Sequence, residues 1–351
     1  SGQSRFILRT TGEISSLSIK PTGDASQFTT TFVDRASRAK CIRFMDCQYT
    51  NASTHDAGKP FMHVQVDGTL TYYHHSWTWQ EMVDISNAAQ CDIWVNVHHL
   101  MASNTAYQDS MANILKNCYG NCYVELSNET WNSAFPQYSW FLSGAGAADQ
   151  FAYYADLADT MFERLAGISA KFKGVLASQA VSSGHYARIK TATRPLNYVH
   201  GLAIGPYWGG NWTYTQSNID PNIVTNTSFS DITAIAMADF HTNWKPYIED
   251  WAGYCATEGW ELMAYEFGSH VSPHPGVNKS TYADCWQHCY DYAKSAEAVS
   301  GYKEFLSFWD SIGGGLACKF VDVSYDEWGS LRTENESSPV WDELLTKMKV
   351  A

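Results

Sequence analysis

The chain has 351 residues, more than one small domain usually needs, but a length that suits a single α/β barrel of about 250 residues with insertions. Hydrophobic residues make up 45% of the chain, enough for a large core, and this composition excludes intrinsic disorder. The formal net charge of −13 repels polyanions, so we expect no nucleic-acid partner. No apolar run reaches the ~18 residues of a membrane-spanning helix, so we expect no membrane span.

Short apolar, β-branched runs alternate with helical patterns along the chain, which is typical of repeated βα units with a parallel sheet. In chain order, the sequence predicts strands at 14–19, 40–46, 92–98, 121–128, 173–180, 201–206, 260–266 and 315–322. It predicts helices at 28–38, 78–90, 104–117, 149–169, 230–250, 281–297, 302–311 and 338–349. The crossover at 182–196 is poorly patterned. Repeated strand–helix units of this number favour an α/β fold of the (β/α)8 TIM-barrel class, and no glycine-rich nucleotide-binding motif supports an open doubly wound sheet.

Long connections rich in Trp, Tyr, Gly and Asn follow the carboxyl ends of several predicted strands, at 47–77, 129–148, 207–229 and 267–280. In a barrel, these connections build the face that holds the active site. No linker, internal repeat or low-complexity tract divides the chain. We therefore expect a single domain over residues 1–351, with 1–13 as an N-terminal extension.

Two of the predicted strands end in glutamate. The strand at 121–128 leads into Asn128-Glu129, and the strand at 260–266 ends at Glu266. If these are strands four and seven, both carboxylates point from the same barrel face into one pocket. Glycoside hydrolysis requires two carboxylates, one to protonate the leaving oxygen and one to attack the anomeric carbon. A salt-bridged strand end is the alternative for either glutamate alone, but their matching positions favour the catalytic interpretation of the pair.

The Asn-Glu after the fourth strand and the Glu at the end of the seventh resemble the pattern of glycoside hydrolase clan A. The segments 42–46 and 124–132 also resemble a little-described group of bacterial and viral proteins. The resemblance implies a (β/α)8-barrel retaining β-glycosidase, and an extracellular or virion-associated location. It also implies that Arg43, His98 and Tyr207 surround the nucleophile.

Physical chemistry suggests a role for each polar residue of this set. As an acid, Glu129 must stay protonated near neutral pH, which requires desolvation by a neighbour such as Trp131 or repulsion from Glu266. As a nucleophile, Glu266 must stay ionised, and Arg43 within ~4–6 Å would lower the pKa of that carboxyl. Asn128 is suited to binding the 2-hydroxyl of the sugar. A tyrosine at 207 can hold the nucleophile, with a core position as the alternative.

Aromatic residues make up 15% of the chain and charged residues only 17%, so the surface relies on rings and neutral polar groups, as sugar-binding clefts do. Tryptophans after strand ends, Trp309 and Trp328 among them, are therefore candidate sugar platforms, with core packing as the alternative for each. Trp208 and Trp212 lie in a glycine-containing stretch that favours an exposed loop. Trp131 follows Glu129 by two positions.

The cysteines are nine, an odd number, so at least one thiol has no partner within the chain. Cys118 and Cys122 bracket a tight turn, where a local disulfide and two free thiols are equally open alternatives. Cys285, His288 and Cys289 share one helix face, but a fourth ligand for a metal is not evident. The sequence therefore predicts no metal and no cofactor.

Together these patterns predict a retaining β-glycoside hydrolase that acts on a polysaccharide or oligosaccharide by double displacement. The alternative is a non-catalytic carbohydrate-binding or receptor-binding module on the same barrel. The predicted catalytic residues are Glu129 and Glu266. The predicted substrate-binding residues are Arg43, His98, Asn128, Trp131, Tyr207, Trp208, Trp212 and Trp309.

Overall fold

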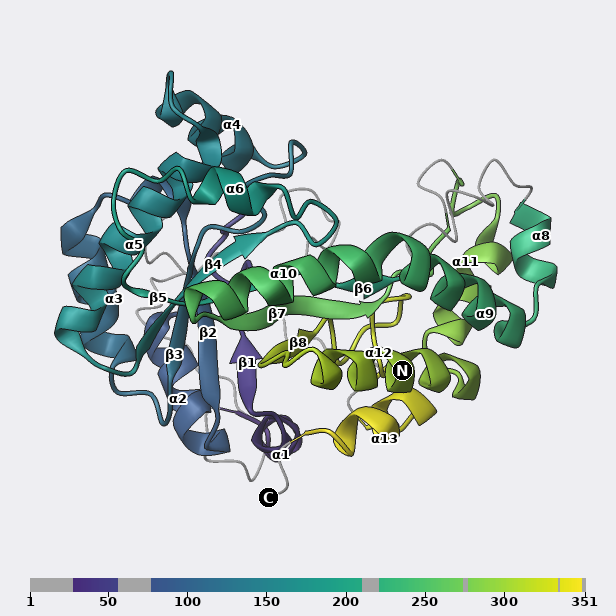
Figure 1. Ribbon diagram of the computed structural model, residues 1–351. Helices are drawn as coiled ribbons and strands as arrows, with labels where there is room; N and C mark the ends of the chain where they lie inside the picture. The colour runs from purple at the N-terminus through teal and green to yellow at the C-terminus, as the bar shows by residue number, and fades with distance from the viewer. Residues whose placement is uncertain (1–27, 56–76, 210–220, 274–276, 334, 349–351) are drawn as a thin grey trace, which may run out of the picture.

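The computed structural model describes residues 28–55, 77–209, 221–273, 277–333 and 335–348 (Figure 1). The strands in this part of the chain are β1 Cys41–Arg43, β2 Asp92–Val97, β3 Cys122–Leu126, β4 Phe172–Ser178, β5 Val199–Ile204, β6 Tyr207–Trp208, β7 Glu261–Ser269 and β8 Ala317–Lys319. All their pairings are parallel, in the order β1-β2-β3-β4-β5-β7, and both β6 and β8 pair with β7. The sheet curls until β8 lies beside β1, where the side chains of Cys318 and Cys41 meet. This arrangement confirms the predicted α/β fold of the barrel class.

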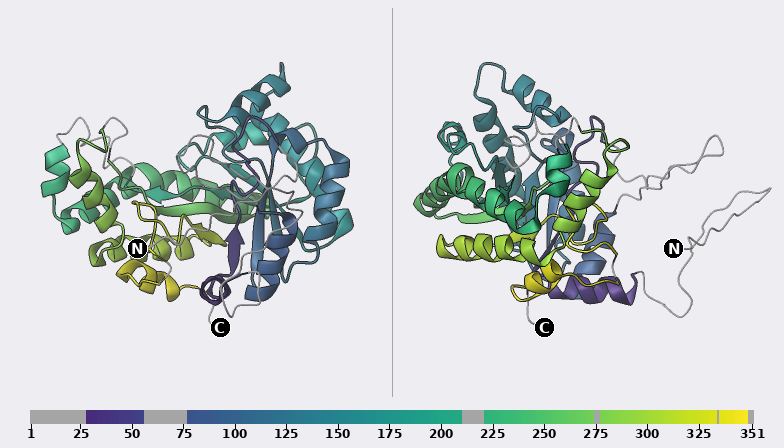
Figure 2. Two further views of the ribbon diagram at one scale, coloured as in Figure 1. Left: turned by 180° about the vertical axis from the view of Figure 1, so that it is seen from behind. Right: turned by 90° about the vertical axis from the view of Figure 1, so that its right-hand side faces the viewer.

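Helices accompany the strands in the described part of the chain, and most of them cover the outside of the curled sheet. They are α1 Thr30–Arg38, α2 Trp79–Ala89, η1 His99–Met101, α3 Thr105–Leu115, α4 Pro136–Ala145, α5 Gln150–Ile168, α6 His185–Ile189, α8 Pro221–Asn226, α9 Phe229–Asp239, η2 Phe240–Trp244, α10 Lys245–Glu258, α11 Ala283–Tyr292, α12 Ala296–Ser311 and α13 Pro339–Leu345. Figure 1 shows α10 lying along β7. Both Figure 1 and the rear view in Figure 2 show α8, α9 and α11 grouped away from β2, β3 and β4. None of the described helices is long and apolar enough to cross a membrane.

Local signals in the sequence explain where several helices begin and end. The hydroxyl of Thr78 caps α2 by accepting from the backbone N–H of Glu81, whose carboxylate accepts from the backbone N–H of Thr78 in return. Asp149 caps α5 without such a reciprocal bond, because its carboxylate accepts from the backbone N–H groups of Phe151 and Ala152. The helix α10 ends at Gly259, which adopts a left-handed conformation with φ of 72°. These caps place the helices within a residue or two of their predicted starts at 78–90 and 149–169.

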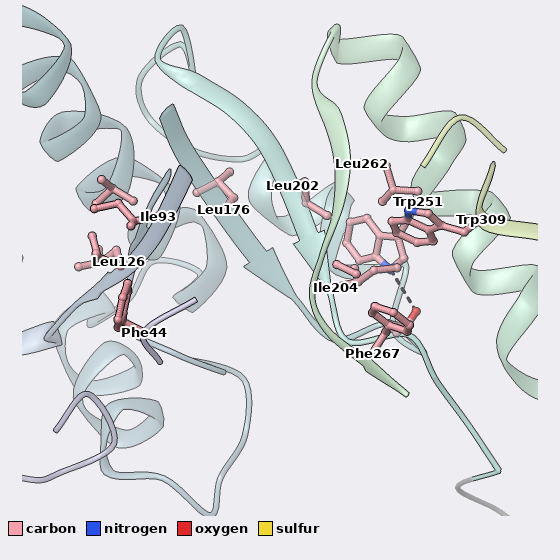
Figure 3. Packing of buried hydrophobic residues seen from close by; sticks show 14 of the residues in the cluster. Phe44, Ile93, Leu126, Leu176, Leu202, Ile204, Trp251, Leu262, Phe267 and Trp309 are labelled. Carbon is pink, nitrogen blue, oxygen red and sulfur yellow. Dashed lines mark hydrogen bonds between the residues drawn. The ribbon is translucent and has the colours of Figure 1, made fainter. Parts of the chain in front are cut away.

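Two layers of side chains follow from the alternation of residues along the strands. The inner layer faces the inside of the curled sheet, and its buried apolar members are Trp94, Tyr123, Val175, Ala177, Ala203, Met263 and Tyr265. The outer layer packs beneath the helices, where Figure 3 shows Trp251 of α10 and Trp309 of α12 beside Leu262 of β7. A polar side chain in the inner layer is shielded from bulk water and needs a partner there.

The strand β7 contains an irregularity that decides where its last residues point. Between the pairs Ala264–Ala317 and Phe267–Lys319, β7 uses one residue more than β8 does, which is a β-bulge. Ala264 and Phe267 belong to the outer core, and Tyr265 belongs to the inner cluster. The extra residue is accommodated by two consecutive inward-facing side chains, so Glu266 also faces the inside of the sheet.

The predicted strand at 14–19 lies outside the described residues. Within the described residues, the structure differs from the prediction at β6, in the helix predicted at 230–250 and in the connection at 129–148. The two-residue strand β6 was not predicted, because it is defined by pairing with β7 rather than by a local pattern. The predicted helix at 230–250 is a run of α9, the π-helical turn η2 and α10 that continues to Glu258. The connection at 129–148 contains the helix α4, which the sequence analysis described as a loop.

Candidate active site

A buried arginine at the end of β1 connects the polar side chains at the carboxyl ends of the strands. Nη2 of Arg43 donates to Oε2 of Glu125 at 2.9 Å and to Oδ1 of Asn128 at 3.0 Å. Nη1 of the same guanidinium lies 3.7 Å from Oε2 of Glu266. The guanidinium also lies over the rings of Trp94 and Tyr265, at 5.5 Å and 5.1 Å from their centroids. Arg43 is therefore within the expected reach of Glu266, but its hydrogen bonds go to Glu125 and Asn128.

Glu129 follows β3 in a sharp turn. Its φ of 42°, like the φ of 65° at Ser127, is uncommon for a residue with a side chain. Each carboxylate oxygen accepts one hydrogen bond, Oε1 from the hydroxyl of Tyr265 at 3.1 Å and Oε2 from the amide of Asn132 at 2.9 Å. The Tyr265 ring needs the glycine at 205, because a Cβ there would lie 2.6 Å from the tyrosine oxygen. Two donors thus orient the Glu129 carboxylate beside the residue that precedes Glu266.

Burial raises the pKa of Glu266 to about 7, even though Arg43 acts to lower it. The negative charge of Glu129 also raises this pKa, whereas a hydrogen bond from the hydroxyl of Tyr207 lowers it. The predicted contacts of Glu266 with Arg43 and Tyr207 are therefore present. Arg43 lowers the pKa of Glu266 as expected, but desolvation by burial is the larger effect, so the pKa lies above its ordinary value.

Asn128 is held from both ends of its amide. Its Oδ1 accepts from Arg43, and its Nδ2 donates to Oδ1 of Asn51 at 3.2 Å. Gln137, a fully buried residue of α4, donates from Nε2 to the backbone carbonyl of Asn128 and to Oδ1 of Asn51, both at 2.7 Å. Through Gln137, the helix α4 therefore holds the backbone of the turn between Asn128 and Glu129.

His98 lies in the loop after β2, and its ring supports that loop. Its Nδ1 accepts from the backbone N–H of Leu100 at 3.1 Å, and its Nε2 donates to the carbonyl of Ala52 at 3.1 Å. Burial lowers the pKa of His98 to about 4, with a further contribution from His55. Both ring nitrogens are hydrogen-bonded to the backbone. His98 therefore stabilises the loop after β2 and is not the substrate contact that the sequence predicted.

The predicted tryptophan platforms differ in their exposure. Trp208 is fully buried, and its ring packs against Tyr302 and against the backbone of Gly301 in α12. Trp309 is buried in the same outer core, where its indole N–H donates to the carbonyl of Gly315 at 3.0 Å. A buried indole has no face left for a sugar ring, so the structure contradicts these two predictions. Trp212 lies outside the described residues.

Two tryptophans remain partly exposed near the carboxylates. The ring of Trp131 lies 5.9 Å from that of Tyr265. The ring of Trp328 lies 5.9 Å from that of Tyr207, the tyrosine that binds Glu266, and 5.0 Å from that of His270. These two indoles flank the inner carboxylates and have accessible surface for an apolar sugar face.

Alanine substitutions should separate the buried from the partly exposed tryptophans. Trp208→Ala should lower the free energy of unfolding by about 3–5 kcal/mol, because it leaves a cavity in the outer core. Trp131→Ala should raise the KM for an oligosaccharide by an amount that corresponds to about 0.5–1.5 kcal/mol, with a smaller loss of stability than Trp208→Ala because its ring is only partly buried. Urea denaturation and steady-state kinetics of both variants check this. An unchanged unfolding midpoint for Trp208→Ala would contradict its burial.

The cysteine and histidine motifs of the sequence do not form a metal centre in the described residues. All nine cysteines are free thiols, which answers the question left open for Cys118 and Cys122. His288 donates from Nε2 to the carbonyl of Thr227 at 2.9 Å, between buried Cys285 and buried Cys289. Within the described ranges, no group of three or more His, Cys, Asp or Glu side chains is arranged to hold a metal ion.

Several residues of this site were not predicted from the sequence. The inward direction of Glu125 could have been predicted from the alternation along its strand. Val124 and Leu126 face the outer core, so the carboxylate between them must face the inner layer. Tyr265 had the same signal of alternation. The role of Gln137 had none, since it depends on how α4 packs against the turn after β3. Asn132 follows Glu129 by only three residues and was not considered as its partner.

No protein-family model and no curated protein matches this sequence. Among solved structures, the chain is similar to the thermostable GH51 α-L-arabinofuranosidase from Thermotoga petrophila RKU-1, with a TM-score of 0.52 and 11% identity over 93% of this chain and 65% of that one. It is also similar to an α-L-arabinofuranosidase from Thermotoga maritima in an arabinose complex, with a TM-score of 0.50 and 10% identity over 90% of this chain and 62% of that one. The chain thus spans less than two thirds of each.

At this level of identity the likeness concerns the fold. The chain shares its curled parallel sheet and surrounding helices with barrel enzymes of the glycoside hydrolase type, as the sequence resemblance implied. The barrel places side chains from the ends of β1, β3 and β7 at one mouth, which is the face where barrel enzymes carry their active sites.

Proposed function

We propose that the protein is a retaining β-glycoside hydrolase that cleaves a polysaccharide or oligosaccharide by double displacement. Glu129 is the acid and base, and Glu266 is the nucleophile. The observation that carries the proposal is the set of contacts at the barrel mouth, where Tyr265 holds Glu129 while Arg43 and Tyr207 face Glu266. The fold shared with the two arabinofuranosidases supports the same class of reaction.

The proposed reaction has two steps. In the first, a carboxylate oxygen of Glu266 bonds to the anomeric carbon while the glycosidic C–O bond breaks, and Glu129 gives its proton to the leaving oxygen. In the second, Glu129 takes a proton from water as that water attacks the anomeric carbon, which breaks the bond to Glu266. The positive charge of Arg43 and the hydroxyl of Tyr207 favour the ionised form of Glu266, which is needed before the first step and regenerated by the second.

The raised pKa of Glu266 gives the proposal a pH signature. A nucleophile with a pKa of about 7 is protonated in more acidic solution, so activity should be lost as the pH falls through that value. We expect the acid limb of the kcat/KM profile near neutrality, well above the ordinary range of a glutamate. A profile measured from pH 4 to 9 checks this. An acid limb at pH 4 to 5 would mean that Glu266 is not the nucleophile or is well solvated.

Screening a panel of β-linked polysaccharides and aryl β-glycosides for reducing ends tests the proposed activity directly. Proton NMR of the first product formed should then show the β anomer, because double displacement retains configuration. An α anomer would indicate a single displacement and overturn the assigned roles. If the wild-type protein binds glycans but releases no product from any of them, the alternative of a binding module replaces this proposal.

A further inference from the structure

The hydrogen bonds of Arg43 are directed away from the proposed nucleophile. At 3.7 Å, the contact of Nη1 with Oε2 of Glu266 is one of charge and is too long for a hydrogen bond. The 2.9 Å bond from Nη2 goes to Glu125, which lies on β3 four residues before Glu129. What fixes the position of the guanidinium is therefore a carboxylate outside the proposed catalytic pair.

Glu125 is itself fixed in a buried environment. Its side chain is 1% exposed, and Oε2 accepts from the indole N–H of Trp94 at 3.0 Å as well as from Arg43. It pairs in register with Asn96 of β2, whose amide donates to the backbone carbonyl of Ser127 at 2.7 Å. An enclosed position on the strand keeps Glu125 from the reacting atoms, so any influence on the reaction must pass through its neighbours.

Several charged and polar groups surround Glu266, and Glu125 is one of them. The groups that face Glu266 are Arg43 of β1, Glu125 of β3, Glu129 beyond β3, Tyr207 of β6, Tyr265 of β7 and Lys319 of β8. The Lys319 ammonium donates to the carbonyls of Phe320 and Trp328, and burial lowers its pKa to about 7. Arg43 is therefore the one permanent cation in this set, and Glu125 competes with Glu266 for it.

We propose that Glu125 is a positioning residue, whose carboxylate anchors Arg43 so that Nη2 holds Asn128 while Nη1 faces Glu266. The Glu125 carboxylate thereby determines where the guanidinium lies and how strongly the guanidinium stabilises the ionised form of Glu266. A negative charge on Glu125 moderates the stabilisation of ionised Glu266. Burial alone raises the pKa of Glu125, and the ion pair with Arg43 opposes this.

Two conservative variants test the charge of Glu125 and the length of its side chain separately. Glu125→Gln keeps an oxygen acceptor but loses the charge, so the pKa of Glu266 should fall by about 1 unit and the acid limb of kcat/KM should move down with it. Glu125→Asp keeps the charge but is too short to hold the guanidinium in place. It should leave the limb near its wild-type position while kcat falls by about tenfold or more and KM changes little.

A variant at the other end of β7 is the matched control. Glu261 accepts from the backbone N–H of Leu316 at 2.9 Å and contacts His200, far along the strand from Glu266. Glu261→Gln should leave the acid limb unchanged, although it also removes a half-buried carboxylate. If Glu125 were needed only for folding, its two variants would lower the unfolding temperature and the fraction of active protein without moving the limb, and this result overturns the inference.

The kinetic readout rests on the proposed function, so a second measurement does not use turnover. The carboxyl carbon of Glu266 can be titrated by NMR in protein with 13C-labelled glutamate, with its signal assigned from Glu266→Gln. The titration midpoint should be lower in Glu125→Gln than in wild type. A lower midpoint in a protein that hydrolyses no glycan keeps the inference and removes the proposed function. An unchanged midpoint in an active enzyme removes the inference and keeps the function.

Discussion

Glu129→Ala and Glu266→Ala are expected to lose activity in different ways, because only one of the two carboxyls serves the leaving group. Without Glu129, turnover of a natural glycan should fall by about 10²–10⁴, the usual contribution of a general acid. An aryl glycoside with a good leaving group needs no proton, so its first step should survive while the second lacks a base. A burst of phenol and a glycosyl adduct on Glu266 should be seen by rapid mixing and mass spectrometry.

Glu266→Ala should show neither the burst nor the adduct, and its activity should be lost for good and poor leaving groups alike. Glu129→Gln is the matched control for folding, since the Glu129 carboxylate accepts from Tyr265 and Asn132, and alanine leaves both donors unpaired. That loss costs about 1–3 kcal/mol of stability for each buried group left unsatisfied. Equal losses across a series of aryl leaving groups in the two alanine variants would refute the assigned roles.

Arg43→Lys should combine a loss of turnover with a shift of the acid limb to higher pH. A lysine offers one compact ammonium and cannot hold Asn128 and Glu125 while it faces Glu266. If the ammonium pairs with Glu125 and lies farther from Glu266, the buried Glu266 carboxyl should gain a proton at higher pH than in wild type. Profiles of kcat/KM against pH in both proteins measure the shift. A fully active variant with an unmoved limb would show that Arg43 does not serve Glu266.

Arg43→Ala extends the same test to stability. It leaves the buried carboxylates of Glu125 and Glu266 without their cation, so the free energy of unfolding should fall by about 3–5 kcal/mol at neutral pH. Part of that loss should be recovered in acid, where both carboxyls can bind protons. Urea denaturation at pH 5 and pH 8 compares the two conditions, and a loss that is the same at both would contradict the buried pairing.

The positions of the two glutamates could be predicted from sequence because they depend on local patterns. A buried strand appears as an apolar run, its carboxyl end is where the run stops, and parallel strands bring those ends to one face. The strand β3 ends shortly before Glu129, within the run predicted at 121–128. The strand β7 begins where the run at 260–266 predicted it, but it continues past Glu266 to Ser269. Helices with side-chain caps, such as α2 and α5, were predicted for a similar reason.

The parts that could not be predicted depend on contacts distant in sequence. The start of α4 at Phe135 has no side-chain cap, so nothing local distinguished it from the aromatic loop around it. Trp208 precedes a Gly-Gly pair that is typical of an exposed turn, yet pairing of β6 with β7 carries its ring onto Gly301. The pKa of Glu266 depends on burial and on several neighbouring charges, and both follow from the folded structure and not from a local pattern in the sequence.

The β-bulge in β7 has a consequence for how this protein can evolve. Because the extra residue lies between Ala264 and Phe267, the pairing of β7 with β8 continues on either side of it, and the outer core receives Phe267 regardless. The orientation of the carboxylate at 266 thus depends on the number of residues in β7 between its pairs with β8, and not on side-chain chemistry alone. Loss of one codon here would remove the bulge, and with it the arrangement that lets both Tyr265 and the proposed nucleophile Glu266 face the inside of the sheet.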